Sequence, residues 1–167
     1  MTGWRDAYLC QARSDWDMWL HLCKVARLPC HRLHYLQMAV EKLGKALLIA
    51  GAGQSIETLQ KSHLAFTKFL LISTRNKALA SQYDMSAEQY RAHVRGIAPL
   101  AYGVEQLGPQ VAHGGPNVEY PWRDPSGRIC APAQEGFSIA EQLGTPRGVN
   151  LLKLIAHMLR ESEARYC

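Results

Sequence analysis

The segment from Pro29 to Ile49, PCHRLHYLQMAVEKLGKALLI, constrains the fold more than any other part of this chain. Its large apolar residues recur at intervals of three and four, which places them on one face of a helix: Leu33, Leu36, Val40, Leu43 and Leu47. The other side is expected to face water or a ligand, and carries Arg32, Gln37, Glu41, Lys42 and Lys45. Pro29 suits a first helical turn, and Gly51 and Gly53 favour its termination. We therefore predict a central helix whose apolar stripe is buried.

Several other segments have helical periodicity. Helices are predicted from about Trp4 to Val25, from Ser62 to about Lys77, from a capping box at Ser86 and Gln89 to Gly108, and from Pro146 to about Arg165. A short helix is predicted over 137–143, and Pro99 should kink the helix that contains it. These patterns predict an all-α, up-and-down bundle of four to five helices, with one domain spanning residues 1–167.

Length and composition set further bounds. The chain has 167 residues, and its longest apolar runs are too short to cross a membrane. Nothing at the N-terminus resembles a secretory signal, so a cytoplasmic protein is expected. The five cysteines are odd in number and irregularly spaced, which favours reduced thiols. A net charge of +5 is compatible with nucleotide or nucleic acid as a partner but does not establish one.

The segment Gly108 to Gly127 is rich in proline and glycine, which predicts a long irregular loop before the last helix. In and beside it lie residues suited to stacking on a base and holding a phosphate: His113, Tyr120, Trp122, Arg123 and Arg128. Lys45 of the central helix is a further candidate for this ligand site. The alternative is that Tyr120 and Trp122 plug the end of the bundle and that Lys45 is a solvated charge.

A metal site is not predicted. Cys23, Cys30, His31 and His34 lie close in sequence, but no Cys-x-x-Cys pair exists and the cluster spans a junction between helices. His21, His63 and His157 are expected to be histidines of the bundle rather than ligands. The chain has no glycine-rich phosphate loop and no Ser-His-Asp pattern, so no cofactor is predicted.

Four stretches together resemble the HEPN family of small helical domains: Ala12 to Trp16, Leu33 to Leu47 with Glu41-Lys42-x-x-Lys45-Ala46-Leu47, Ser62-His63-Leu64, and Glu119-Tyr120-Pro121-Trp122. The likeness covers most of the chain. It implies a bundle of four or five helices, usually dimeric, that binds nucleotide or RNA. Many members of that family are ribonucleases, and others act beside a nucleotidyltransferase partner.

The chain departs from the catalytic pattern of that family, in which an Arg is followed by a His after four to six residues near the start of a late helix. Here Arg91, His93 and Arg95 are separated by single residues, which point to different sides of a helix. Arg27 and His34 have a suitable separation but lie at the entry to the central helix. Glu119 precedes the Tyr-Pro turn, where relatives often have Arg.

The sequence leaves three hypotheses. The first is a HEPN-like protein that binds nucleotide or RNA, as a homodimer or beside a partner, without the usual Arg/His motif. The second is a metal-independent ribonuclease of a toxin or defence system, in which Arg and His meet from separate elements; the catalytic candidates are Arg91, His93 and His113. The third is a purely structural interaction protein.

Overall fold

The computed structural model describes residues 3–25, 27–52 and 54–164. Within these residues the chain forms eight α-helices, one short 3-10 helix and one two-stranded hairpin. The elements are α1 (Trp4–Lys24), α2 (Pro29–Ala52), α3 (Ile56–Gln60), α4 (Ala65–Ser73), α5 (Lys77–Gln82), α6 (Ala87–Glu105), β1 (Trp122–Arg123), β2 (Ile129–Cys130), η1 (Pro132–Gln134), α7 (Ser138–Leu143) and α8 (Pro146–Ala164). The prediction of an all-α bundle is confirmed, and no described helix has the length and apolar character that crossing a bilayer requires.

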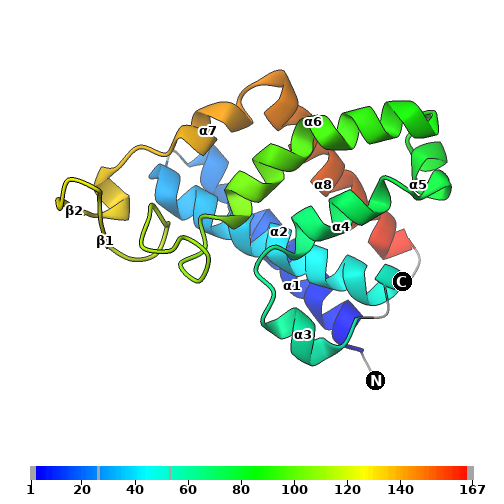
Figure 1. Ribbon diagram of the computed structural model, residues 1–167, viewed down its shortest axis with the longest axis horizontal. Helices are drawn as coiled ribbons and strands as arrows, with labels where there is room; N and C mark the ends of the chain where they lie inside the picture. Colours follow the sequence, from blue (N-terminus) through cyan, green and yellow to red (C-terminus); the bar gives the residue numbers. More distant parts are fainter. Residues whose placement is uncertain (1–2, 26, 53, 165–167) are drawn as a thin grey trace.

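Helix α2 is the centre of the core, as its pattern predicts. Leu36, Val40 and Leu43 are fully buried, and α2 packs against α1, α4 and α6 (Figure 1). The contact with α4 is especially close, because a Cβ placed on Gly44 would lie 2.2 Å from the backbone nitrogen of Phe66. Only glycine at position 44 allows the two backbones to approach in this way.

The helix boundaries follow local chemistry. The predicted capping box is present: the Ser86 hydroxyl accepts a hydrogen bond from the Gln89 backbone N–H, and the Gln89 side chain accepts one from Ser86 N–H. The helix predicted over 62–77 was placed too widely. Within it, α4 spans only Ala65–Ser73, and a separate helix, α5, begins at Lys77 and is capped by the Asn76 side chain through Ala78 N–H and Leu79 N–H. The predicted end of α2 was also early, since the helix continues through Gly51 to Ala52.

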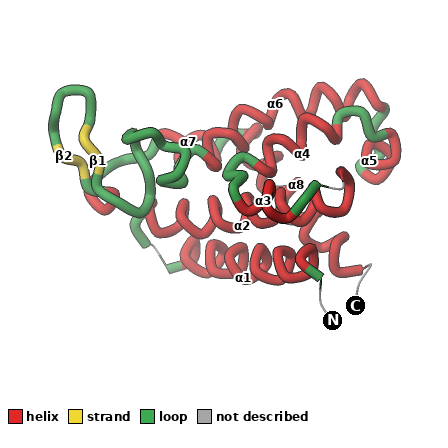
Figure 2. Tube along the Cα trace, turned by 60° about the horizontal axis from the view of Figure 1, so that its bottom comes forward, coloured by secondary structure: helices red, strands yellow, loops and turns green. Residues whose placement is uncertain are grey.

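The proline- and glycine-rich segment after α6 is largely irregular, as predicted, except that Trp122 and Arg123 pair with Cys130 and Ile129 in an antiparallel hairpin. Both views place this hairpin at one end of the molecule, beyond α7, while α5 lies at the other end (Figures 1 and 2). The short helix predicted over 137–143 corresponds to α7.

Candidate functional site

A cavity of about 540 Å³ lies between α6, α8 and the turn that joins α5 to α6. We call it the α6–α8 cavity. Its lining residues are Tyr83, Met85, His93, Asn150, Lys153, Leu154, Ala156, His157 and Arg160. Its volume falls in the range of ~300–1,000 Å³ that is typical of small-molecule sites. The cavity is therefore large enough to hold a ligand of nucleotide size.

The basic residues of the cavity come from two helices. Lys153, His157 and Arg160 follow one another on α8 at intervals of four and three, so they share one face of that helix. His93 approaches from α6. Among the described residues that line the cavity, none is acidic. Lys153 and Arg160 thus provide cationic donors for an anionic group, while Glu161 lines an adjoining pocket with Tyr83 and His157.

The two imidazoles of the cavity differ in their surroundings. Burial lowers the pKa of His93, so its neutral form, which can accept a proton, predominates at neutral pH. His157 has a buried Nε2 without a hydrogen-bond partner in the protein, and its ring centroid lies 4.6 Å from that of Tyr83. A buried polar atom without a partner is unfavourable.

Tyr83 forms an aromatic side of the cavity, and its ring packs against Tyr90. Its ring stacks on Tyr90, with centroids 5.7 Å apart and planes inclined by 16°. The Tyr90 hydroxyl lies 3.1 Å from Ser73 Oγ at the end of α4, which fixes the pair against the core. Burial raises the pKa of Tyr83 well above its ordinary value, so its hydroxyl stays neutral. Tyr83, Met85 and Leu154 thus form an apolar surface beside the basic groups.

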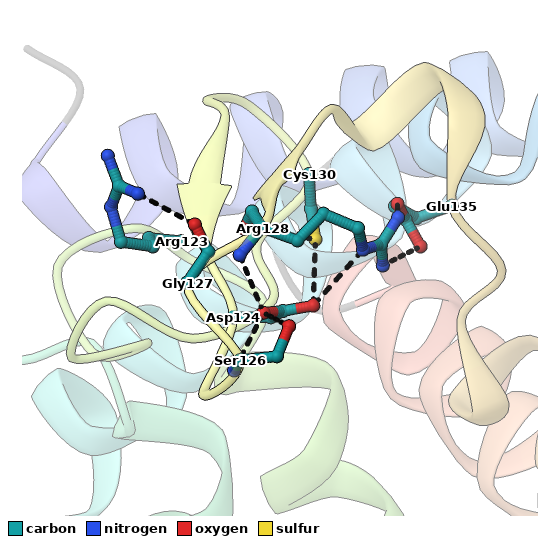
Figure 3. A network of polar contacts seen from close by, with 7 residues as sticks. All are labelled: Arg123, Asp124, Ser126, Gly127, Arg128, Cys130 and Glu135. Carbon is teal, nitrogen blue, oxygen red and sulfur yellow. Dashed lines mark hydrogen bonds and ion pairs between the residues drawn. The ribbon is translucent and has the colours of Figure 1, made fainter.

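The two arginines of the predicted ligand loop form intramolecular contacts (Figure 3). Arg128 lies 3.1 Å from Asp124 and 2.7 Å from Glu135, and Arg123 donates to the Gly127 carbonyl at 2.6 Å. The hydroxyl of Ser126 is the main cause that lowers the pKa of Asp124 to about 2, so the carboxylate stays charged. These contacts hold the hairpin and engage all three side-chain nitrogens of Arg128 but only one of Arg123.

The aromatic residues of the loop are separated by their packing. The ring centroid of Trp122 lies 6.3 Å from that of Phe137, which is buried, whereas the Tyr120 side chain is 60% exposed. His113 is exposed and has a positive φ of 47°. Glu119 places a carboxylate oxygen 3.5 Å from His34 Nδ1 on α2. Trp122 therefore agrees with the plug interpretation, and Tyr120 with an exposed surface.

The prediction that Lys45 lies on an open side of α2 was wrong. It is only 6% exposed, donates to Glu41 Oε1 at 2.7 Å, and lies ~16 Å along α2 from the part of the helix that meets the loop at His34. Gln37 and His63 also contact Glu41. The reason is that neighbouring elements cover α2 on its polar side as well as on its apolar side.

Several charged residues in the stretches that carry the family resemblance form ion pairs with one another. Lys42 Nζ lies 2.6 Å from Asp15 Oδ2, which joins α2 to α1, and Asp15 is buried. Glu41 joins Lys45 and His63. Buried charges are tolerated when they are paired in this way. These contacts give the motif a structural role that is independent of any ligand.

The catalytic candidates are placed differently from one another. His93 lines the α6–α8 cavity, while Arg91 lies on the exposed side of α6 and His113 lies in the loop after that helix. The arginine that accompanies His93 at the cavity is Arg160.

Among the four residues weighed for zinc, Cys30 is buried, and the described residues contain no group of three or more His, Cys, Asp or Glu that could hold a metal.

Sequence reasoning missed most of this cavity. His157 was interpreted as a histidine of the bundle, and Lys153, Arg160 and Tyr83 were not singled out. A usable pattern was present, because Lys153, His157 and Arg160 form a basic stripe at helical spacing beside the apolar stripe of the last helix. What the sequence did not contain was the position of His93 and Tyr83 opposite that stripe.

Comparison of the chain with models of known protein families, with curated proteins and with solved structures gave no significant match.

Proposed function

We propose that the α6–α8 cavity binds a phosphate-bearing ligand, a nucleotide or RNA. The observation that carries this proposal is the grouping of His93, Lys153, His157 and Arg160 around one cavity that has no acidic lining residue among those described. Lysine and arginine hold phosphate by charge-assisted hydrogen bonds. The apolar surface at Tyr83 and Leu154 suits the face of a base. The resemblance to HEPN domains supports the same ligand class.

A binding experiment tests this function. The protein is titrated calorimetrically with ribonucleoside mono- and triphosphates and with a short single-stranded RNA, and Lys153→Ala and Arg160→Ala are compared with the unmodified chain. Each variant should weaken binding by about 10- to 100-fold, because a hydrogen bond to a charged group contributes about 1.5–3 kcal/mol. Lys68→Ala, which removes an exposed lysine from α4, should leave the affinity within about twofold.

The same experiment separates this function from a purely structural role. A ligand at a hundred times its dissociation constant should stabilise the protein by about 2.7 kcal/mol. If no nucleotide or RNA binds or raises the melting temperature, the binding function is wrong and the interaction hypothesis is favoured. An equal loss of affinity in Lys68→Ala would show that net charge, rather than the cavity, attracts the ligand.

One observation favours a second candidate, metal-independent RNA cleavage: two imidazoles line the same cavity, and the pKa of one is lowered by burial. In such a reaction the 2′-oxygen of RNA attacks phosphorus while His93 accepts its proton. The bond from phosphorus to the 5′-oxygen breaks, and His157 supplies the proton that this oxygen takes up. The products are a 2′,3′-cyclic phosphate and a 5′-hydroxyl.

RNA incubated with the protein in EDTA tests the second candidate. Cleavage should occur, and His93→Ala and His157→Ala should each abolish it, because one general acid or base contributes about 10²- to 10⁴-fold. His113→Ala is the comparison variant, since it removes the histidine that lies in the loop. If RNA stays intact, or if cleavage depends on His113 alone, the ribonuclease assignment to this cavity is wrong.

A further inference from the structure

A second cavity, of about 390 Å³, lies on the other side of α8, between that helix and α1. We call it the α1–α8 cavity. Its lining residues are Arg13, Trp16, Asp17, Leu20, Ala156, Leu159 and Arg160. Ala156 and Arg160 line both this cavity and the α6–α8 cavity. The two cavities are therefore adjacent, and the exposed Arg160 lines both of them.

The α1–α8 cavity has the chemistry of a second nucleotide position. Leu20 is the most exposed of its apolar lining residues, whereas Trp16 and Leu159 are buried and Trp16 packs against Trp19 with ring centroids 4.5 Å apart. An exposed apolar side chain beside a cation can contact the face of a base without sequence preference. Asp17 is the acidic lining residue; a carboxylate repels phosphate but can accept a hydrogen bond from the amino group of a base.

Arg160 lies between the two cavities, at the position that a phosphate joining two nucleotides would occupy. It is the cation common to both cavities, and none of the described acidic residues forms an ion pair with it. The other neighbour of the α6–α8 cavity shares Tyr83 and His157 with it but has a volume of only about 130 Å³ and is lined by Glu161. A phosphate-linked chain thus has a more suitable path across Arg160 than past Glu161.

We propose that the ligand is a single-stranded oligonucleotide that crosses α8, with one nucleotide in each cavity and a connecting phosphate at Arg160. This inference rests on the proposed function of the α6–α8 cavity and specifies its ligand. A free mononucleotide would fill the α6–α8 cavity and leave the α1–α8 cavity empty. The oligonucleotide gains an apolar contact at Leu20 that the mononucleotide does not make.

The test compares AMP with a labelled single-stranded RNA of about eight nucleotides by fluorescence polarisation and competition. The oligonucleotide should bind at least ~10-fold more tightly, because the second nucleotide adds apolar contact at Leu20, and burial of about 55 Å² of apolar surface corresponds to a tenfold change in affinity. Leu20→Glu places a carboxylate in the α1–α8 cavity at a residue that is 38% exposed, and should reduce RNA binding to about the level of AMP without changing AMP binding. Met18→Glu is the control, since it adds the same charge at a 40% exposed position on the same helix.

Three results would overturn the inference while leaving the proposed function intact: RNA binding no more tightly than AMP, Leu20→Glu leaving RNA binding unchanged, or Met18→Glu weakening RNA binding as much as Leu20→Glu does. Circular dichroism of both variants shows whether α1 remains folded. If neither AMP nor RNA binds to the unmodified protein, the proposed function itself is wrong.

Discussion

Glu105 is a buried carboxyl group that accepts hydrogen bonds from the start of another helix. It lies on the apolar face of α6, is fully buried, and accepts hydrogen bonds from Phe66 N–H at 2.9 Å and Thr67 N–H at 3.0 Å. It therefore caps the start of α4 from a different helix. Burial raises the pKa of Glu105 to about 7 although these hydrogen bonds act to lower it, and the charge of Glu41 raises it further. The cap is thus a carboxyl group that titrates near neutral pH.

The pH dependence of unfolding tests this account. Because the pKa of Glu105 is higher in the folded than in the unfolded protein, protonation favours the folded state, and this contribution is lost as pH rises from about 4.5 to about 7. Relative to Glu105→Gln, the free energy of unfolding of the unmodified protein should fall by about 3 kcal/mol across that range. Urea unfolding at a series of pH values measures the difference. A difference that does not vary with pH would contradict the assignment, and Glu88→Gln, on the exposed side of α6, gives the baseline.

At the scale of elements, the β1–β2 hairpin is held by side chains rather than by a long ladder. Asp124 Oδ1 accepts hydrogen bonds from the backbone N–H groups of Ser126 and Arg128 at 2.9 and 3.0 Å, and Oδ2 lies 3.1 Å from Arg128 Nε. Arg128 also forms an ion pair with Glu135, which lies just after η1 (Figure 3). A two-residue strand pair has little stability alone, so this network determines the shape of the hairpin.

Limited proteolysis tests the role of that network. Asp124→Ala should open the hairpin, and trypsin should then cleave after Arg123 and Arg128 faster than in the unmodified protein. The melting temperature should change little, because the contacts of Asp124 are made within the hairpin and not with the helices. Asp124→Asn keeps an oxygen that accepts the two backbone hydrogen bonds but loses the ion pair, so its cleavage rate should be intermediate. Unchanged cleavage in Asp124→Ala would show that other contacts hold the hairpin.

At the scale of the whole molecule, the position of α4 depends on α2 and α6 together. Gly44 lets the backbone of α4 touch α2, and Glu105 receives the first N–H groups of α4 from the other side. The first turn of α4 also contributes buried Phe66 to the core. Displacing α4 would therefore disturb α2, α6 and the core between them at once.

Two glycine substitutions test this dependence. Gly44→Ala would place a methyl group 2.2 Å from Phe66 N, which must move α4, so a loss of about 3 kcal/mol or more in the free energy of unfolding is expected. Gly96→Ala, within α6, meets no atom within 4 Å and should stabilise the protein by about 0.4–1 kcal/mol. Thermal unfolding of both variants measures the contrast. Similar effects of the two substitutions would show that the α2–α4 contact can relax.

The helical elements and the apolar stripe of α2 were predictable because they depend on local spacing and on caps such as Ser86 with Gln89. The start of α4 was not, because the backbone N–H groups of Phe66 and Thr67 are satisfied by Glu105, far away in the chain, and α5 was not predicted as a helix. For the candidate site, His93 was among the predicted residues, but its partners on α8 were not. In the predicted loop site, Arg128 contacts two carboxylates and Arg123 a carbonyl, and the ligand role of the loop stays a prediction.

From the sequence alone, the all-α class, the central helix and the irregular segment after residue 108 follow, since each depends on residues that are neighbours along the chain. The tertiary structure decided which polar residues are internal and which surround a cavity. Lys45 and Lys153 are both lysines on amphipathic helices, yet Lys45 is buried beside Glu41 and Lys153 lines the α6–α8 cavity. That difference arises from the helices packed around each of them, which spacing within a single helix does not encode.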